Sequence, residues 1–194
     1  MLDLQPAARR MADLVSGLPD SALGGPTPCP EYTVGDLVDH VGGMAVAFTA
    51  AAAKAGGAAG AAGPSGDASR LGDGWRDRIA GQLAELGRAW REPAAWTGET
   101  EAGGLRLPGE VAGLVALDEL VVHGWDLARA TGRPYAVDSA SLEAVHTFVE
   151  GFAGPDAGPA RAGLFGPAVP VPADAPLLDR VIGLTGRDPG WSPG

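Results

Sequence analysis

The segment from residue 110 to residue 131 constrains the fold most, because its apolar side chains cover nearly the whole circumference of a helix. These side chains are Leu114, Val115, Leu117, Leu120, Val121, Val122, Trp125 and Leu127. Gly132 and Pro134 follow the segment, as is common where a helix ends. A helix that is apolar all round has to be enclosed by other elements. The sequence therefore predicts a central helix that other helices surround.

Apolar residues at helical spacing predict three helices before this segment. The first has Asp3 as a candidate cap, the second opens at Thr33 with Asp36 in a capping-box-like pair, and the third has Asp73 as a candidate cap. Their expected inner faces are Leu4, Ala8, Met11, Val15 and Leu18; Leu37, Val41, Met44 and Phe48; and Trp75, Ile79, Leu83, Leu86 and Trp90. Residues 50–69 are mostly Ala and Gly, which predicts a short prolongation of the second helix and then a flexible connection.

Two shorter helices are predicted after the central one. One begins near Asp138 or Ser139, and the other ends before Gly186. Between them, closely spaced prolines in residues 167–172 require an extended strap. Residues 92–107 are expected to be irregular, with a short strand at most. The fold class is therefore predicted as all-α: a four-helix bundle with additional C-terminal helices and an extended Pro-rich strap.

Length and composition limit the organisation and the partners of the chain. Its 194 residues are expected to form a single domain, with the bundle over about residues 1–153 and a C-terminal extension over about residues 154–194. The net charge of −10 argues against nucleic acid or a membrane surface as partner and favours a small molecule. Cys29 is the only cysteine, which excludes an intrachain disulfide and a thiolate-rich zinc site. We found no signal-peptide pattern and no long apolar run, so we expect a cytoplasmic protein.

A carboxylate and an imidazole share one face of the central helix. Glu119 and His123 are four residues apart, so both side chains point the same way from a segment that is otherwise too apolar for a surface. His40 lies on the flank of the second helix's apolar face and is aimed at neighbouring helices. Two imidazoles and one carboxylate would bind a divalent metal ion and leave coordination positions open. The sequence therefore predicts a metal site at His40, Glu119 and His123.

These polar residues also allow structural interpretations. A Glu and a His at this spacing are more often hydrogen-bond or charge partners on a surface. Cys29 precedes a helix N-terminus, but between prolines it is better interpreted as a packed small side chain. His146 is better interpreted as packing at the edge of its helix than as a fourth ligand.

Trp125 and its neighbour Asp126 are interpreted as structural. Trp125 is predicted to lie opposite Glu119 and His123 and to pack in the core. Asp126 is expected to meet Arg129 or Arg133, or to accept a backbone hydrogen bond. No catalytic residue is assigned beyond the metal site.

Two stretches of sequence resemble a known family. They run from Thr27 to His40 and from Glu119 to Gly132, and the likeness continues to the closing Gly186-Arg187-Asp188-Pro189. The pattern resembles the DinB/YfiT-like metalloproteins, specifically the mycothiol-dependent maleylpyruvate isomerase type. The resemblance implies a four-helix bundle that binds one divalent ion, usually zinc and sometimes nickel, through the residues matching His40, Glu119 and His123. It also implies that the open positions accept the thiolate of a small thiol, mycothiol in actinobacteria.

The chain departs from the isomerase type at its C-terminal end. The isomerase carries an extra α/β domain that contributes an arginine to catalysis, and the residues after the central helix here are too few for that domain. The resemblance therefore favours a mycothiol-dependent S-transferase acting on a small electrophile over maleylpyruvate isomerisation. The alternative is a non-catalytic metal-binding, ligand-binding or sensing module of the same fold, and a homodimer is left open.

Overall fold

The structure is a computed structural model that describes residues 2–55, 65–153 and 164–193. This part of the chain contains six α-helices: α1 (Gln5–Ser16), α2 (Val34–Ala52), α3 (Trp75–Ala89), α4 (Gly109–Ala130), α5 (Ser139–Glu150) and α7 (Leu177–Leu184). Short 3-10 turns are η1 (Asp20–Ala22), η3 (Ala68–Arg70) and η4 (Pro93–Trp96), and the strands are β1 (Glu99–Ala102) and β2 (Leu105–Pro108). The prediction of an all-α fold is confirmed.

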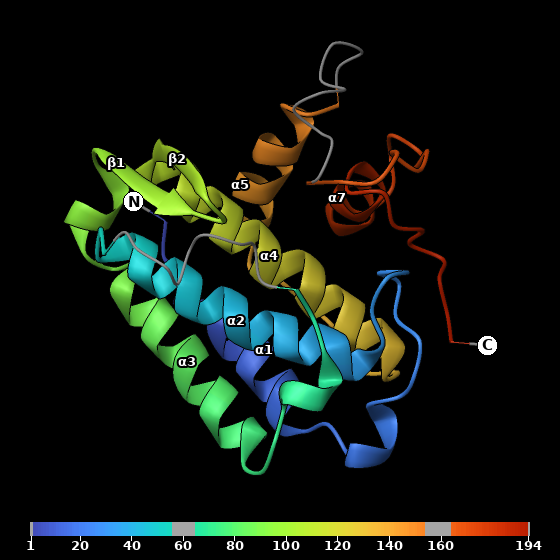
Figure 1. Ribbon diagram of the computed structural model, residues 1–194. Coiled ribbons are helices and arrows are strands. Elements are labelled where there is room, and N and C mark those ends of the chain that lie inside the picture. The colour runs from blue at the N-terminus through green and yellow to red at the C-terminus, as the bar shows by residue number, and fades with distance from the viewer. Residues whose placement is uncertain (1, 56–64, 154–163, 194) are drawn as a thin grey trace.

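Helices α1 to α4 form a four-helix bundle (Figure 1). Helix α1 packs against α3 and α4, and α2 packs against the same two helices, so α1 and α2 lie on opposite corners of the bundle. Helix α5 packs on α4 and on α7, outside the bundle. Because α4 contacts α1, α2 and α5, it is the enclosed helix that its apolar circumference predicts.

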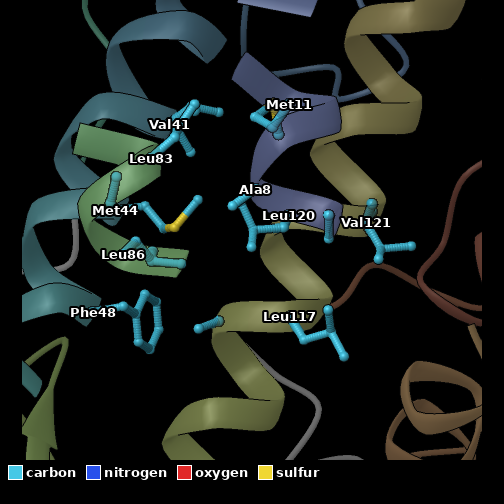
Figure 2. Packing of buried hydrophobic residues seen from close by; sticks show 14 of the residues in the cluster. Ala8, Met11, Val41, Met44, Phe48, Leu83, Leu86, Leu117, Leu120 and Val121 are labelled. Carbon is cyan, nitrogen blue, oxygen red and sulfur yellow. The ribbon is translucent and has the colours of Figure 1, made fainter. Parts of the chain in front are cut away.

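The bundle interior is filled by side chains from all four helices (Figure 2). Met44 of α2, Leu83 of α3 and Leu120 of α4 are fully buried, and each such side chain stabilises the fold by roughly 1.5–3 kcal/mol. Trp90, also fully buried, donates its indole N–H to the carbonyl oxygen of Phe48 at 3.1 Å. Burial of these side chains confirms the predicted inner faces, and the Trp90 hydrogen bond ties the end of α3 to α2.

Several predicted helix ends are confirmed by their capping contacts. Thr33 and Asp36 form a full capping box at the start of α2. Asp138 accepts a hydrogen bond from the backbone N–H of Ser141 at the start of α5. Gly132 follows α4 with φ +65°, the left-handed conformation that closes a helix.

Two predicted caps are wrong in detail. Asp73 does not cap α3, because Gly74 occupies the cap position in the left-handed region and no side chain bonds to the first turn. Leu4, not Asp3, is the cap residue of α1, although the Asp3 carboxylate accepts a hydrogen bond from the backbone N–H of Gln5 at 3.0 Å. In both cases the helix begins one residue or more after the position that the polar side chain indicated.

The connection before α4 has more strand than expected. Strands β1 and β2 pair antiparallel, with Ala102 opposite Leu105 and with Gly103 and Gly104 in the turn. Both glycines have positive φ, +58° and +76°, which suits a tight hairpin turn. Each strand has only four residues; exposed and buried side chains alternate along β1, whereas the side chains of β2 are mostly exposed.

The remaining predictions concern connections. Helix α2 ends at Ala52, and residues 56–64 of the expected flexible connection lie outside the described residues. Residues 167–172 are not helical, as predicted, and Val169 N–H bonds to the carbonyl oxygen of Gly183 at 2.9 Å. Among the helices described, none has the length and apolar character needed to span a bilayer.

Candidate metal centre

His40 is placed by the start of α2. The Thr33 hydroxyl accepts a hydrogen bond from the Asp36 N–H, and the Asp36 carboxylate accepts one from the Thr33 N–H. This capping box defines the first turn, and His40 follows about two turns later, facing α4. Its side chain is 11% exposed. The predicted inward orientation of His40 is therefore what the structure shows.

Glu119 and His123 lie one turn apart on α4. Two alanines on the same face, Ala112 and Ala116, are fully buried. The side chain of His123 is 10% exposed and that of Glu119 is 26% exposed, so the carboxylate is the more accessible of the two. The pair is thus buried on one side and open on the other.

The three side chains converge on one point. Nε2 of His40 lies 3.1 Å, and Nε2 of His123 lies 3.2 Å, from the same oxygen of Glu119, Oε2. Ligand atoms of the three residues all lie within 4.8 Å of one another. Residues from two helices that are distant in sequence therefore form a cluster of the size that one cation can occupy.

Electrostatics in the cluster favour a negative carboxylate beside positive imidazole. Burial alone would raise the pKa of Glu119, but hydrogen bonds to His123 and His40 and their positive charge hold it well below its usual range. Burial alone would lower the pKa of His123, but its hydrogen bonds to Asp126 and Glu119 raise it to about 9. The site therefore attracts positive charge, either as a proton or as a metal cation.

The donor set fits a divalent cation. Nδ1 of His123 lies 2.9 Å from Oδ2 of Asp126, and a carboxylate oxygen can only accept, so we assign the proton to Nδ1. Nε2 of a neutral His123 ring then directs its lone pair at Oε2 of Glu119, which is also an acceptor. A positive charge between these atoms removes their repulsion. Two imidazole nitrogens and one carboxylate oxygen are ligands that suit zinc or nickel.

Asp126 is held by a residue that sequence reasoning missed. Both of its oxygens accept hydrogen bonds from the guanidinium of Arg187, Oδ2 at 3.1 Å and Oδ1 at 3.3 Å. The expectation that Asp126 meets Arg129 or Arg133 is therefore wrong. Arg187 lies after α7, and no local spacing rule could pair it with α4.

A cavity of about 730 Å³ opens beside the cluster, with His40 and Glu119 in its wall. The rest of the described wall is mostly apolar and includes Met44, Phe48, Val111, Val115, Phe148 and Phe152. The rings of Phe148 and Phe152 lie 5.2 Å apart, edge to face. The volume suits a small organic molecule placed against the candidate ligands.

Residues 4–128 match the family model of the mycothiol maleylpyruvate isomerase N-terminal domain. The chain belongs to this family. The match spans α1 to α4 almost completely, so it includes His40, Glu119 and His123. The resemblance drawn from the sequence motifs is confirmed.

Relatives of this family member include two proteins of Mycobacterium tuberculosis, one from strain CDC 1551 and one from strain H37Rv. Each is 27% identical over 184 residues, which is 94% of this chain and 94% of the relative. Both are uncharacterised proteins. Their similarity therefore extends beyond the family domain into the C-terminal helices.

Solved structures of similar fold are the mycothiol-dependent maleylpyruvate isomerase, with a TM-score of 0.58, and a histidine-to-alanine mutant of it, with 0.56. Both are 17% identical to this family member, and each match covers 75% of this chain. The same matches cover 66% of the isomerase chain, about two thirds of its length. At this identity the likeness shows the bundle fold.

Cys29 and His146, which we interpreted from the sequence as packing side chains, lie outside the cluster. Burial raises the pKa of the half-buried Cys29 thiol, although Arg187 opposes the shift, which fits a packed thiol and not an activated one. His146 lies on α5, where Nε2 is 3.0 Å from the guanidinium of Arg180 and 3.4 Å from the carboxylate of Glu150. Neither residue belongs to the ligand group found among the described residues.

Asp118 is a buried carboxyl beside the cluster that sequence reasoning did not single out. It is 6% exposed, and its Oδ1 has no hydrogen-bond partner within the described residues. Burial, followed by the negative charge of Glu119, raises the pKa of Asp118 to about 8. The signal in the sequence was a charged residue in an otherwise apolar helix.

Proposed function

We propose that the chain binds one divalent metal ion through His40, Glu119 and His123, zinc in the first instance and nickel as the alternative. The observation that carries the proposal is the convergence of three ligand atoms within 4.8 Å, next to a cavity. Three protein ligands leave a position open, as in catalytic zinc sites. An ion bound there would lower the pKa of a thiol that reaches it and keep the thiolate in place.

We further propose that the thiol is mycothiol or a similar small thiol and that the chain is a thiol S-transferase. Membership of the mycothiol maleylpyruvate isomerase N-terminal domain family supports the thiol. His40 and Glu119 form part of the cavity wall, so a molecule in the cavity lies beside the thiol. The apolar wall would orient an electrophile against the sulfur and keep water away from it.

The lining of the cavity favours a neutral, apolar electrophile as the substrate. Among its described lining residues, Arg106 is the one permanently cationic side chain, and its guanidinium pairs with the Glu99 carboxylate at 2.7 Å. A dicarboxylate such as maleylpyruvate would meet little compensating charge on these walls. With a halogenated aromatic, the thiolate sulfur would bond to the ring carbon and the halide would leave with its electron pair, while the thiol proton passes to solvent.

The test is consumption of a chlorodinitrobenzene by the zinc-loaded protein in the presence of mycothiol, with glutathione and cysteine as comparison thiols. We expect turnover above the uncatalysed reaction that requires both zinc and the thiol. Glu119→Gln should remove turnover while the circular dichroism spectrum stays helical. His146→Ala is the matched control, because His146 lies on α5 outside the cluster, and it should keep turnover.

A non-catalytic metal-binding module predicts a different result in the same experiments. Chelation would lower the thermal stability of the protein, because metal binding stabilises only the folded state. No thiol would then accelerate consumption of the electrophile. That outcome would retain the metal site and overturn the transferase.

A further inference from the structure

The C-terminal segment after α7 reaches back to the candidate metal centre. Gly186, with φ +89°, ends α7, and Arg187 follows it. The Arg187 side chain is 12% exposed, and Asp126, which it contacts, is fully buried. A guanidinium that bonds side-on to both oxygens of a carboxylate fixes the orientation of that carboxylate.

The oriented carboxylate in turn contacts a metal-ligand candidate. Oδ2 of Asp126 lies 3.1 Å from Arg187 and 2.9 Å from Nδ1 of His123. A proton held on Nδ1 leaves Nε2 as the ligand atom, and Nε2 faces Glu119 at 3.2 Å. Arg187, Asp126 and His123 therefore form a continuous chain of contacts from the C-terminal segment to the centre.

We propose that Arg187 is a positioning residue of the metal centre, which acts through Asp126 to hold the ring angle and the Nε2-ligating tautomer of His123. The role rests on the proposed metal site and not on the transferase activity. It also gives the C-terminal extension a function, because this segment completes the surroundings of a ligand on α4. Arg129 helps to seat the segment by donating to the carbonyl oxygens of Pro189 and Trp191.

The test compares zinc affinity, measured by competition with a chromophoric chelator, in the full chain and in variants. Arg187→Ala and Asp126→Asn are each expected to weaken zinc binding by about 10–100-fold. The double variant should be no weaker than Asp126→Asn alone, because both residues act on the same ring. Above pH 9, where the His123 ring of the zinc-free protein is neutral, its ring nitrogen shifts in NMR spectra of the variants should show loss of the single tautomer.

Arg133→Ala is the matched control. Arg133 also ties down the end of α4, by donating to the carbonyl oxygens of Asp13 and Leu14, but it does not bond to Asp126. We expect it to lower thermal stability and leave zinc affinity unchanged. If Arg187→Ala does not fold, Arg187→Lys keeps the charge without the side-on fork, and it should still weaken zinc binding and disturb the tautomer.

The outcomes separate this inference from the proposed function. If the wild-type chain binds no zinc, the metal site itself is wrong. If the wild type binds zinc and the Arg187 variants lose only thermal stability, with the affinity and the His123 shifts unchanged, Arg187 is a structural ion-pair partner and the inference is overturned.

Discussion

The imidazole rings of His40 and His123 lie edge to face, with their centroids 4.9 Å apart and their planes at 81°. The contact joins α2 to α4 at the point where both Nε2 atoms face Glu119. Bundle packing alone would favour apolar side chains at such a position, since unpaired buried polar groups cost free energy. Two imidazoles directed at one carboxylate are the arrangement on which the proposed metal site rests.

Removal of either imidazole should empty the site. We expect His40→Ala and His123→Ala to reduce bound zinc to a small fraction of the wild-type content, because each leaves only two protein ligands. The measurement is elemental analysis of protein purified in the presence of zinc. His146→Ala should retain the wild-type metal content, and equal content in all three variants would contradict the ligand assignment.

Zinc binding should displace a proton. Because the pKa of His123 is raised to about 9, its ring carries a proton at neutral pH, and that proton competes with the metal. Zinc affinity should therefore rise by about tenfold per pH unit as the pH approaches 9. Calorimetry in buffers of different ionisation enthalpy would measure the proton released per zinc bound.

The stability of the zinc-free protein should fall over the pH range in which zinc affinity rises. A raised pKa means that the protonated His123 stabilises the folded state below its ordinary value of 6.5, and that this contribution is lost as the pH rises through 9. An increase of zinc-free stability over this range, or zinc binding without proton release, would contradict the assignment.

Local patterns predicted the bundle well. The inner face of α2, including Leu37 and Met44, follows from helical spacing, and its start at Thr33 follows from a capping box that involves neighbours in sequence. The position of His40 on that helix was predictable for the same reason. Spacing on α4 likewise placed Glu119 and His123 on one face.

Contacts across the chain were not predictable in this way. Asp126 pairs with Arg187 because the segment after α7 returns to α4, which depends on tertiary packing. Arg129, the partner expected from spacing, lies over the ring of Trp125 and bonds to the C-terminal segment. The cavity could not be predicted from local patterns either, because its walls combine residues of α2, α4, α5 and the hairpin.

The charge of Asp118 should weaken the fold as the pH rises. Its pKa of about 8 lies above its ordinary value of 3.8, so the folded state loses stability between these two values. Asp118→Asn removes this pH dependence. The free energy of unfolding of the variant minus that of the wild type should therefore be larger at pH 8 than at pH 5, by about 1 kcal/mol or more. Urea unfolding of zinc-free protein at the two pH values measures it. Asp13→Asn, at an exposed position on α1, is the control variant.

Filling the cavity should slow turnover without removing the metal. Val111 is half-buried in the cavity wall, so Val111→Phe places a ring where the electrophile is proposed to bind. We expect kcat/KM for the chlorodinitrobenzene to fall about tenfold or more, with zinc content unchanged. Val46→Phe on the exposed face of α2 is the control. Unchanged kinetics in Val111→Phe would place the electrophile elsewhere.

The capping box at the start of α2 should contribute measurably to stability. Thr33→Ala removes the hydroxyl that accepts from the Asp36 N–H, so a first-turn donor loses its partner. The expected loss is about 1 kcal/mol, or a decrease in Tm of about 2–4 °C for a chain of this size. Thr49→Ala is the matched control. The Thr49 hydroxyl donates to the Ala45 carbonyl oxygen within the same helix, so its loss leaves no backbone N–H of the first turn without a partner. Equal losses in the two variants, measured by calorimetry, would show that the cap adds nothing specific.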